Sequence, residues 1–220
     1  MYKALVPDRT SVTRLKLKPI IVEDLPAVLE LDRLCFGGLW TLDGYQRELE
    51  SPNSNLIGIF TPSPPHPLTP SPPPPLLAIG CLWAILEEAH ITILGVHPRY
   101  RHQGLGQMLL VALLTAACDR DLERATLEVR ASNAAAVSLY EKFDFNQAGH
   151  RRSYYQDPNE DALVLWRSGL SKPEFRQTLA SWYQEASDRL IASGWDLSST
   201  TPHFLDKVPN CCYIPILGSE

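Results

Sequence analysis

A short turn between two apolar segments carries residue types that bind anions. The apolar run 91–96 predicts a strand, and the apolar pattern 105–118 predicts a long helix. The turn that joins them contains arginines and the glycines of Gly104-Leu105-Gly106. Unpaired backbone N–H groups and the positive end of a helix dipole attract phosphate at such a point. A Cβ on the glycines would hold phosphate oxygens away from those amides.

The chemistry that this turn indicates is phosphate binding. It is not a dinucleotide fingerprint, because Leu109 occupies the third glycine position of G-x-G-x-x-G, and no Gly-Lys-Ser/Thr occurs. The alternative for the turn taken alone is the start of a buried helix.

Glu128 and Tyr140, in a second stretch, are side chains that can accept or donate a proton. Alternation along 125–130 predicts a strand in which Glu128 faces away from the apolar side chains. A glutamate in mid-strand is unfavourable by propensity, so it requires a partner, solvent or a task; an ion pair on a wet face is the alternative. Asn133 is a natural N-cap of the next helix. Tyr140 lies two turns along it, near the same face, where an aromatic at the edge of the core is the alternative.

A sheet with helices on its faces is needed to hold both stretches. Strands alternate with helices in the hydrophobic pattern, which predicts an α/β (α+β) fold with a mixed sheet. The predicted strands are 12–18, 55–60, 76–86, 89–96, 125–130, 145–155 and 162–166, and the predicted helices are 21–34, 41–50, 104–120, 133–143 and 171–194.

Local signals mark several helix ends. Pro26 lies in the first turn of one helix, Gly37 follows its end, and Thr41 is the expected N-cap of the next helix. The sequence Ser171-Lys172-Pro173-Glu174 predicts a capping box for the last helix, which Gly194 terminates. The tail after this helix has three prolines but also contains Trp, Phe and Tyr, so we expect it to pack on the domain.

Residues 61–75 contain nine prolines. No regular helix or sheet accepts that many, so we expect an exposed, polyproline-II-like loop between two strands. It is either a stiff, tolerated insertion or a docking peptide.

Composition excludes several classes of protein. Twenty basic and twenty-five acidic side chains give a net charge of −5, which argues against broad binding to nucleic acid or anionic membranes. The five cysteines are irregularly spaced and predict reduced thiols in a cytoplasmic protein, with no metal site even at Cys211-Cys212. The start of the chain has no apolar leader, and the longest apolar run, 76–86, is too short to span a bilayer.

Taken together, the motifs resemble the RimI subfamily of the GNAT superfamily of N-acetyltransferases. Arg101-x-x-Gly104-x-Gly106 after an apolar strand resembles the superfamily's pyrophosphate loop. The subfamily, bacterial enzymes that acetylate the N-terminal alanine of a small-subunit ribosomal protein, is resembled at Leu127-Glu128-Val129-Arg130-Ala131-Ser132-Asn133-Ala134-Ala135-Ala136, Leu139-Tyr140-Glu141, Arg151-Arg152-Ser153-Tyr154-Tyr155 and Glu160-Asp161-Ala162.

The resemblance covers residues 12–167 and has three departures. Asp144 stands where the family usually has glycine, the Pro-rich loop is extra, and so is the chain after Arg167. None of these touches the residues to which the resemblance assigns a role.

The resemblance implies a GNAT fold, with a mostly antiparallel twisted sheet, and acetyl-CoA as co-substrate. It implies that Glu128 is the general base and Tyr140 the general acid, roles open to a carboxylate and a phenol. The residues implied to bind the cofactor are Leu94, Gly95, Val96, His102, Gln103, Gly104, Leu105, Gly106, Gln107 and Asn133. For the acceptor we expect Trp40, Arg152, Tyr154 and Tyr155, whose alternative is ordinary packing.

The predicted organisation is an acetyltransferase domain, 1–167, with a C-terminal helix and tail, 168–220, packed on it. The expected function is acetyl-CoA-dependent acetylation of the N-terminal alanine of a ribosomal protein by direct attack in a ternary complex. The expected partner is a peptide, without direct contact to nucleic acid or membrane. Two alternatives stay open: acetylation of a small amine or a lysine side chain, and a non-catalytic acyl-CoA-binding scaffold.

Overall fold

The computed structural model of the protein describes residues 12–62, 75–156 and 158–197. In this part of the chain, a seven-stranded sheet has the order β2-β3-β4-β5-β6-β8-β7. Every neighbouring pair is antiparallel except β5 and β6. The strands are β2 (Lys16–Pro19), β3 (Ser54–Phe60), β4 (Leu76–Ile85), β5 (Glu88–Val96), β6 (Arg124–Arg130), β7 (Asn146–Gln156) and β8 (Asn159–Ser168).

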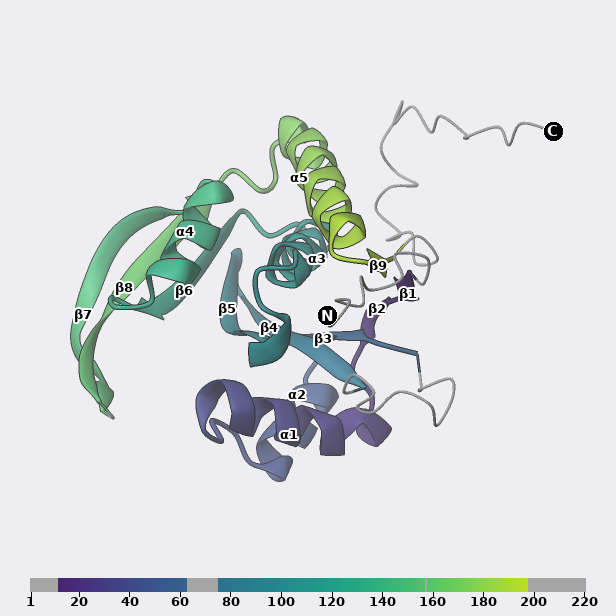
Figure 1. Cartoon of the computed structure of the whole chain (residues 1–220). Helices are drawn as coiled ribbons and strands as arrows, with labels where there is room; N and C mark the ends of the chain where they lie inside the picture. The colour runs from purple at the N-terminus through teal and green to yellow at the C-terminus, as the bar shows by residue number, and fades with distance from the viewer. Residues whose placement is uncertain (1–11, 63–74, 157, 198–220) are drawn as a thin grey trace, which may run out of the picture.

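Helices cover both faces of this sheet, as predicted (Figure 1). On one face, α1 and α2 pack over β3, β4 and β5, and on the other face lie α3, α4 and α5. The helices are α1 (Leu25–Phe36), α2 (Leu42–Glu50), α3 (Leu105–Asp119), α4 (Ala134–Lys142) and α5 (Pro173–Ala192). The α/β fold class and the predicted order of elements are confirmed.

Several predicted helix ends are confirmed. Pro26 lies in the first turn of α1, and Gly37 ends this helix with a left-handed φ of 78°. Thr41 caps α2, because its hydroxyl accepts a hydrogen bond from the Gly44 N–H at 3.2 Å. Asn133 caps α4 in the same way, through the Ala136 N–H at 3.2 Å.

Two expectations about the ends of the described chain are wrong. The capping box does not form, because the N-cap of α5 is Lys172, without a side-chain cap, and not Ser171. The single strand predicted at 12–18 is two strands, separated by the fully buried Leu15. The first of them, β1 (Thr13–Arg14), leaves the sheet to pair in parallel with β9 (Trp195–Asp196), which follows α5.

The parallel pair β5–β6 is short, and this positions the site. The two strands pair only between Glu88–His90 and Arg124–Thr126. Beyond that point β5 continues with β4 and β6 continues with β8, so β5 and β6 diverge (Figure 1). Among the described residues, no helix is both long enough and apolar enough to cross a membrane.

Candidate active site

Glu128 projects from β6 just beyond the point where this strand leaves β5. Its side chain is only 7% exposed, and its carboxylate is held at both oxygens. Arg151 Nη2 lies 2.8 Å from Oε1, and His90 Nε2 lies 3.3 Å from Oε2. Leu127 and Val129 are buried on the opposite face, as alternation predicts. The ion pair that the sequence left open is present, and it orients the carboxylate.

His90 contacts Glu128 but was not among the site residues predicted from the sequence. Its Nδ1 lies 3.0 Å from Thr126 Oγ1, which donates a hydrogen bond to Glu88 Oε1 at 2.6 Å. Arg124 Nε in turn lies 3.3 Å from Glu88 Oε2. A series of contacting polar side chains therefore runs from Glu128 to Arg124, along the segment where β5 and β6 pair. Polar residues at alternate positions of β5 were a signal for it, but only strand pairing shows what they face.

A buried carboxylate fixes the loop between α1 and α2. Asp32, on α1, is fully buried. Its Oδ1 accepts a hydrogen bond from the Leu39 N–H at 2.9 Å, and its Oδ2 accepts one from the Trp40 N–H at 3.0 Å. Hydrogen bonds to a carboxylate in a buried place are stronger than those between neutral groups. The path of this loop, and with it the position of Trp40, is set by Asp32.

An aromatic row connects this loop to Glu128. The rings of Trp40 and Trp83 are stacked, with centroids 6.1 Å apart and planes within 6°, and the Trp83 and His90 rings are 6.4 Å apart. Trp83 Nε1 donates a hydrogen bond to Glu48 Oε2 at 2.6 Å, which anchors the indole. Trp40 was predicted to lie near the acceptor. The rings of Trp83 and His90 connect it to the Glu128 carboxylate.

Tyr140 is buried on α4, with its ring 5.7 Å from that of Phe145. It belongs to the core, as its alternative interpretation held. Burial first, and the neighbouring Tyr155 second, raise the pKa of Tyr140 above its usual value of 10.0. The phenol therefore stays protonated at neutral pH, which is the form that a general acid needs.

The predicted acceptor residues on β7 have different surroundings. Tyr155 Oη donates a hydrogen bond to the Glu128 carbonyl at 3.4 Å, and the guanidinium of Arg130 lies 4.1 Å from its ring centroid. Tyr154 is 45% exposed and meets Tyr155 edge-on at 5.2 Å. Arg152 is exposed, and its neighbour Arg151 makes the ion pair with Glu128.

Strand parity explains why Arg151 and not Arg152 faces Glu128. Residues 151 and 155 lie on one face of an alternating strand, and 152 lies on the other. The strand is also irregular here, because its register with β8 shifts between Arg151 and Tyr155. Ser153 has a left-handed φ of 48°, and its N–H donates to Asp161 Oδ1 at 2.8 Å. Parity in the sequence separates Arg151 from Arg152, but only the pairing of β6 and β7 with β8 shows that Arg151 is on the face of Glu128.

The turn before α3 has the backbone and the charges of an anion site. His102 and Gly104 have φ values of 63° and 92°, so the chain passes twice through the left-handed region before the helix begins. Arg99, Arg101 and His102 are all exposed around it. Arg101 Nε donates a hydrogen bond to the Val96 carbonyl at 3.3 Å. Consecutive turn amides, a helix start and cations together attract anions.

The end of β5 is already engaged by the protein. A Cβ on Gly95 would lie 2.7 Å from Phe36 Cζ, so this glycine is required by packing against α1. The Val96 carbonyl also accepts a hydrogen bond from Cys35 Sγ at 3.4 Å. Leu94 is half-buried and lies near Gly106 of α3. The glycine at 95 therefore has a structural reason of its own.

The physical reason predicted for Gly104 needs correction. A Cβ at this position would lie 3.1 Å from Arg189 Cβ and 3.2 Å from both the Ala186 carbonyl oxygen and the Leu190 nitrogen. All three belong to α5. The close approach of this helix and the φ of 92° require glycine, so space for phosphate oxygens is not the only reason for it.

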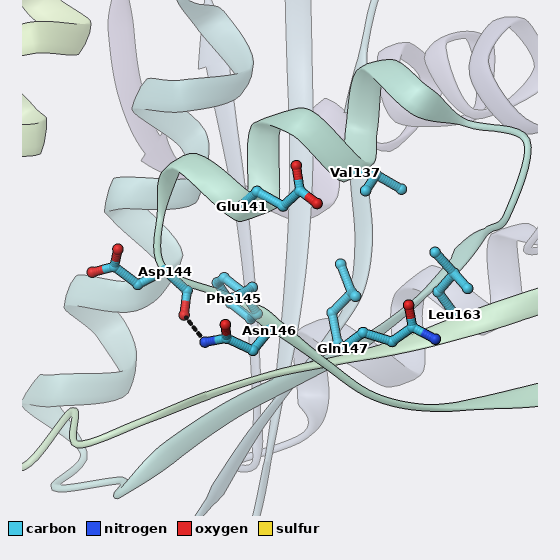
Figure 2. A pocket seen from close by; sticks show the side chains of 8 residues that line it. Val137, Glu141, Asp144, Phe145, Asn146, Gln147 and Leu163 are labelled. Carbon is cyan, nitrogen blue, oxygen red and sulfur yellow. Dashed lines mark hydrogen bonds between the residues drawn. The ribbon is translucent and has the colours of Figure 1, made fainter.

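A pocket of about 270 Å³ lies away from these residues, between α4 and β7 (Figure 2). Val137 and Glu141 of α4 line one side, and Asn146 and Gln147 of β7 line the other. Asp144, between them, has a left-handed φ of 57°, the conformation that the usual family glycine adopts freely. None of the predicted site residues lines this pocket.

Residues 25–145 match the Acetyltransferase (GNAT) family, which is more than half of the chain. The chain belongs to the GNAT acetyltransferase family. The match includes β5, the turn, α3, β6 and α4, which are the elements that carry the cofactor-binding and catalytic candidates.

Two individual GNAT proteins are similar in sequence to this chain. A Bacillus subtilis (strain 168) protein, provisionally named a ribosomal protein bS18-alanine N-acetyltransferase, is 32% identical over 155 residues, which are 70% of this chain and 95% of that protein. The Escherichia coli (strain K12) protein named as the bS18-alanine N-acetyltransferase is 43% identical over 90 residues. These are 40% of this chain and 61% of that protein.

A solved GNAT structure agrees with the fold. The crystal structure of the Escherichia coli ribosomal-protein-S18-alanine N-acetyltransferase aligns with a TM-score of 0.59 and 28% identity, over 70% of this chain and 93% of that one. The chain is therefore an N-acetyltransferase of the GNAT family with RimI-type relatives. The open alternative of a non-catalytic scaffold is not supported. The GNAT match ends before α5, which lies outside it.

Proposed function

We propose that this GNAT protein acetylates the N-terminal alanine of a small-subunit ribosomal protein, with acetyl-CoA as donor. The observation that carries the proposal is the convergence of His90 and Arg151 on Glu128, beside the end of the β5–β6 pairing. The relatives named as bS18-alanine N-acetyltransferases support the acceptor. An acetyl acceptor is a partner that needs a base at this point, whereas a scaffold does not.

The residues of the turn fit acetyl-CoA. Left-handed residues 102 and 104 turn the chain into the start of α3, and exposed Arg99 and Arg101 are available for phosphate oxygens. Within the described residues, Gln107 Oε1 near this helix start is buried and has no hydrogen-bond partner. A ligand that donates a hydrogen bond to this oxygen would satisfy it. The amides of 102–107 would hold the pyrophosphate, the end of β5 the pantetheine arm, and Asn133 Nδ2 a cofactor oxygen.

When bound, the cofactor supplies an acetyl thioester; this chain's residues manage the protons. The α-amino nitrogen of the acceptor forms a bond to the acetyl carbon while the carbon–sulfur bond breaks. Glu128 takes a proton from that nitrogen, directly or through water. An α-amino group has a pKa of about 8, so a carboxylate base is sufficient. Tyr140 Oη gives a proton to the departing sulfur, which its protonated state allows.

The acceptor would approach along the aromatic row. Trp40, Trp83 and His90 lead from the α1–α2 loop to Glu128, and Tyr155 touches the Glu128 backbone from β7. Rings on both sides of the carboxylate favour a slot for a small first residue such as alanine. A lysine side chain or a small amine would need the same base but would make less use of these walls.

Mass spectrometry of peptides incubated with acetyl-CoA tests the proposal. Peptides that begin with Ala, Ser or Met, and one with an internal Lys and a blocked amino terminus, are compared. We expect acetylation at the N-terminal nitrogen, fastest for Ala. Equal or faster acetylation of the internal lysine would overturn the proposed acceptor.

Matched variants test the two proton-transfer roles. Glu128→Gln and Tyr140→Phe each remove the proton-transfer group and keep the shape, so we expect kcat to fall by about 100-fold or more with CoA affinity retained. Turnover at the unaltered rate in both variants would remove these roles.

A further inference from the structure

The helix α5 is built onto the turn that is proposed to hold the cofactor. Gly104 faces the last turns of α5 so closely that a Cβ at this position would lie only 3.1–3.2 Å from atoms of Arg189, Ala186 and Leu190. Ala186 and Leu190 of α5 are buried in one core cluster with Leu105 and Met108 of α3. The GNAT family match ends at residue 145, so α5 lies outside the matched residues.

The segment after α5 holds the same turn from a second side. Trp195 Nε1 donates a hydrogen bond to Gln103 Oε1 at 2.7 Å. Its indole also meets the Tyr100 ring edge-on, with centroids 5.8 Å apart. Trp195 itself is buried. The turn is therefore fixed by contacts from both α5 and β9.

Arg189 is the cation that α5 brings to this place. Its Cβ is the atom closest to the position where Gly104 would carry a side chain, and the rest of its side chain is exposed. Within the described part of the chain, no carboxylate or carbonyl pairs with its guanidinium. A long, planar side chain with several donors, attached beside a phosphate-binding turn, is well suited to a phosphate oxygen.

We propose that α5 completes the cofactor site and that Arg189 binds a phosphate group of CoA. This inference rests on the proposed cofactor site at the turn. It gives the chain after residue 167 a direct part in binding. A last-turn arginine also suits the negative end of its own helix, so the experiment must separate binding from helix stability.

Calorimetric titration of the full-length protein with CoA tests this. In Arg189→Ala we expect the Kd for CoA to rise about tenfold, the size of one charge-assisted contact, with an unchanged melting temperature in the absence of CoA. Arg189→Lys should recover part of the affinity, because it keeps the charge but loses the planar fork. Arg47→Ala, an exposed arginine on α2 across the sheet, is the control and should bind CoA normally.

Dephospho-CoA identifies the phosphate. If Arg189→Ala weakens CoA and dephospho-CoA alike, the contact is to the pyrophosphate; if it weakens CoA alone, the contact is to the 3′-phosphate. Unchanged affinity for both, or a loss explained by a lower melting temperature, overturns the inference and leaves the proposed function standing. Failure of the unaltered protein to bind CoA would overturn both.

Discussion

Glu128 has two partners, and they differ in how firmly they hold it. His90 is half-buried within the sheet, and Arg151 is 57% exposed on the edge strand β7. The carboxylate is thus oriented from one side by a half-buried ring and from the other by a solvent-exposed cation. Of the two partners, Arg151 is the one that solvent and an incoming acceptor can reach.

The neighbouring arginines of β7 offer a matched pair of variants. Arg151→Gln removes an orienting contact of Glu128, so we expect kcat/KM to fall by up to roughly fivefold, the equivalent of a weak exposed pair. Arg152→Gln removes a charge of the same kind from the other face and should leave kcat/KM unchanged. Steady-state rates on an alanine peptide decide this. An unchanged kcat/KM in Arg151→Gln would show that the ion pair has no part in the reaction.

Tyr140 predicts a feature of the pH profile. Its pKa is raised above 10.0, so the protonated form persists to higher pH than in a free tyrosine. The acid is present below that pKa and lost above it, so we expect no decline of kcat from this group between about pH 8 and about pH 10. The profile of kcat against pH measures it. A descending limb below pH 10 that disappears in Tyr140→Phe would contradict the raised pKa of this phenol.

At the scale of elements, the loop between α1 and α2 is positioned from inside the protein. Asp32 is buried beneath it and accepts both the Leu39 and Trp40 N–H groups. A helix residue therefore controls a loop that the aromatic row connects to Glu128. In this position Trp40 stacks on Trp83.

Asp32→Asn should separate loop position from chemistry. One of the two N–H groups loses its acceptor, so we expect a loss of about 1–3 kcal/mol in the free energy of unfolding. The displaced Trp40 should raise KM for the peptide more than it lowers kcat. Denaturant titration and steady-state kinetics measure the two effects. Asp43→Asn, an exposed acid on α2, is the control; equal changes in both variants would argue against a special role of Asp32.

At the scale of the whole molecule, α5 spans both core clusters on its face of the sheet. Phe175 and Leu179, near its start, are buried with α4 and β6, while Ala186 and Leu190, near its end, are buried with β3 and β4. These two groups of strands are the ones that diverge where β5 and β6 cease to pair (Figure 1). The helix packs against α3 along this course and ties the two parts together.

Removal of residues 169–220 tests the predicted division of the chain at residue 167. Each large apolar side chain that α5 buries contributes about 1.5–3 kcal/mol, and whole domains are stable by only about 5–15 kcal/mol. We therefore expect the truncated protein to lose its cooperative thermal transition. Calorimetry of the full and truncated chains compares them. A truncated chain that melts at the same temperature would mean that residues 1–168 fold without α5.

The sequence by itself determined the order of elements and the main chemical candidates. Periodicity, a glycine-containing turn and helix caps are local signals, so they predicted β5, α3, β6 and α4 with their ends nearly correct. Alternation within β6 was enough to put Glu128 opposite Leu127 and Val129. The same local reasoning predicted the N-cap at Asn133. Two interpretations failed: the capping box of α5, and the single strand at 12–18, where the longer-range pairing of β1 with β9 competed.

Only the tertiary structure decided which side chains meet. His90 reaches Glu128 because β5 and β6 are neighbours in parallel for a few residues, and no pattern within one strand contains that pairing. Trp83 joins Trp40 to His90 across three elements. The contact between α5 and Gly104 joins residues far apart in the chain, because burial of apolar faces brings the last helix back over α3. Local signals determine the elements, whereas the packing of their faces determines the site.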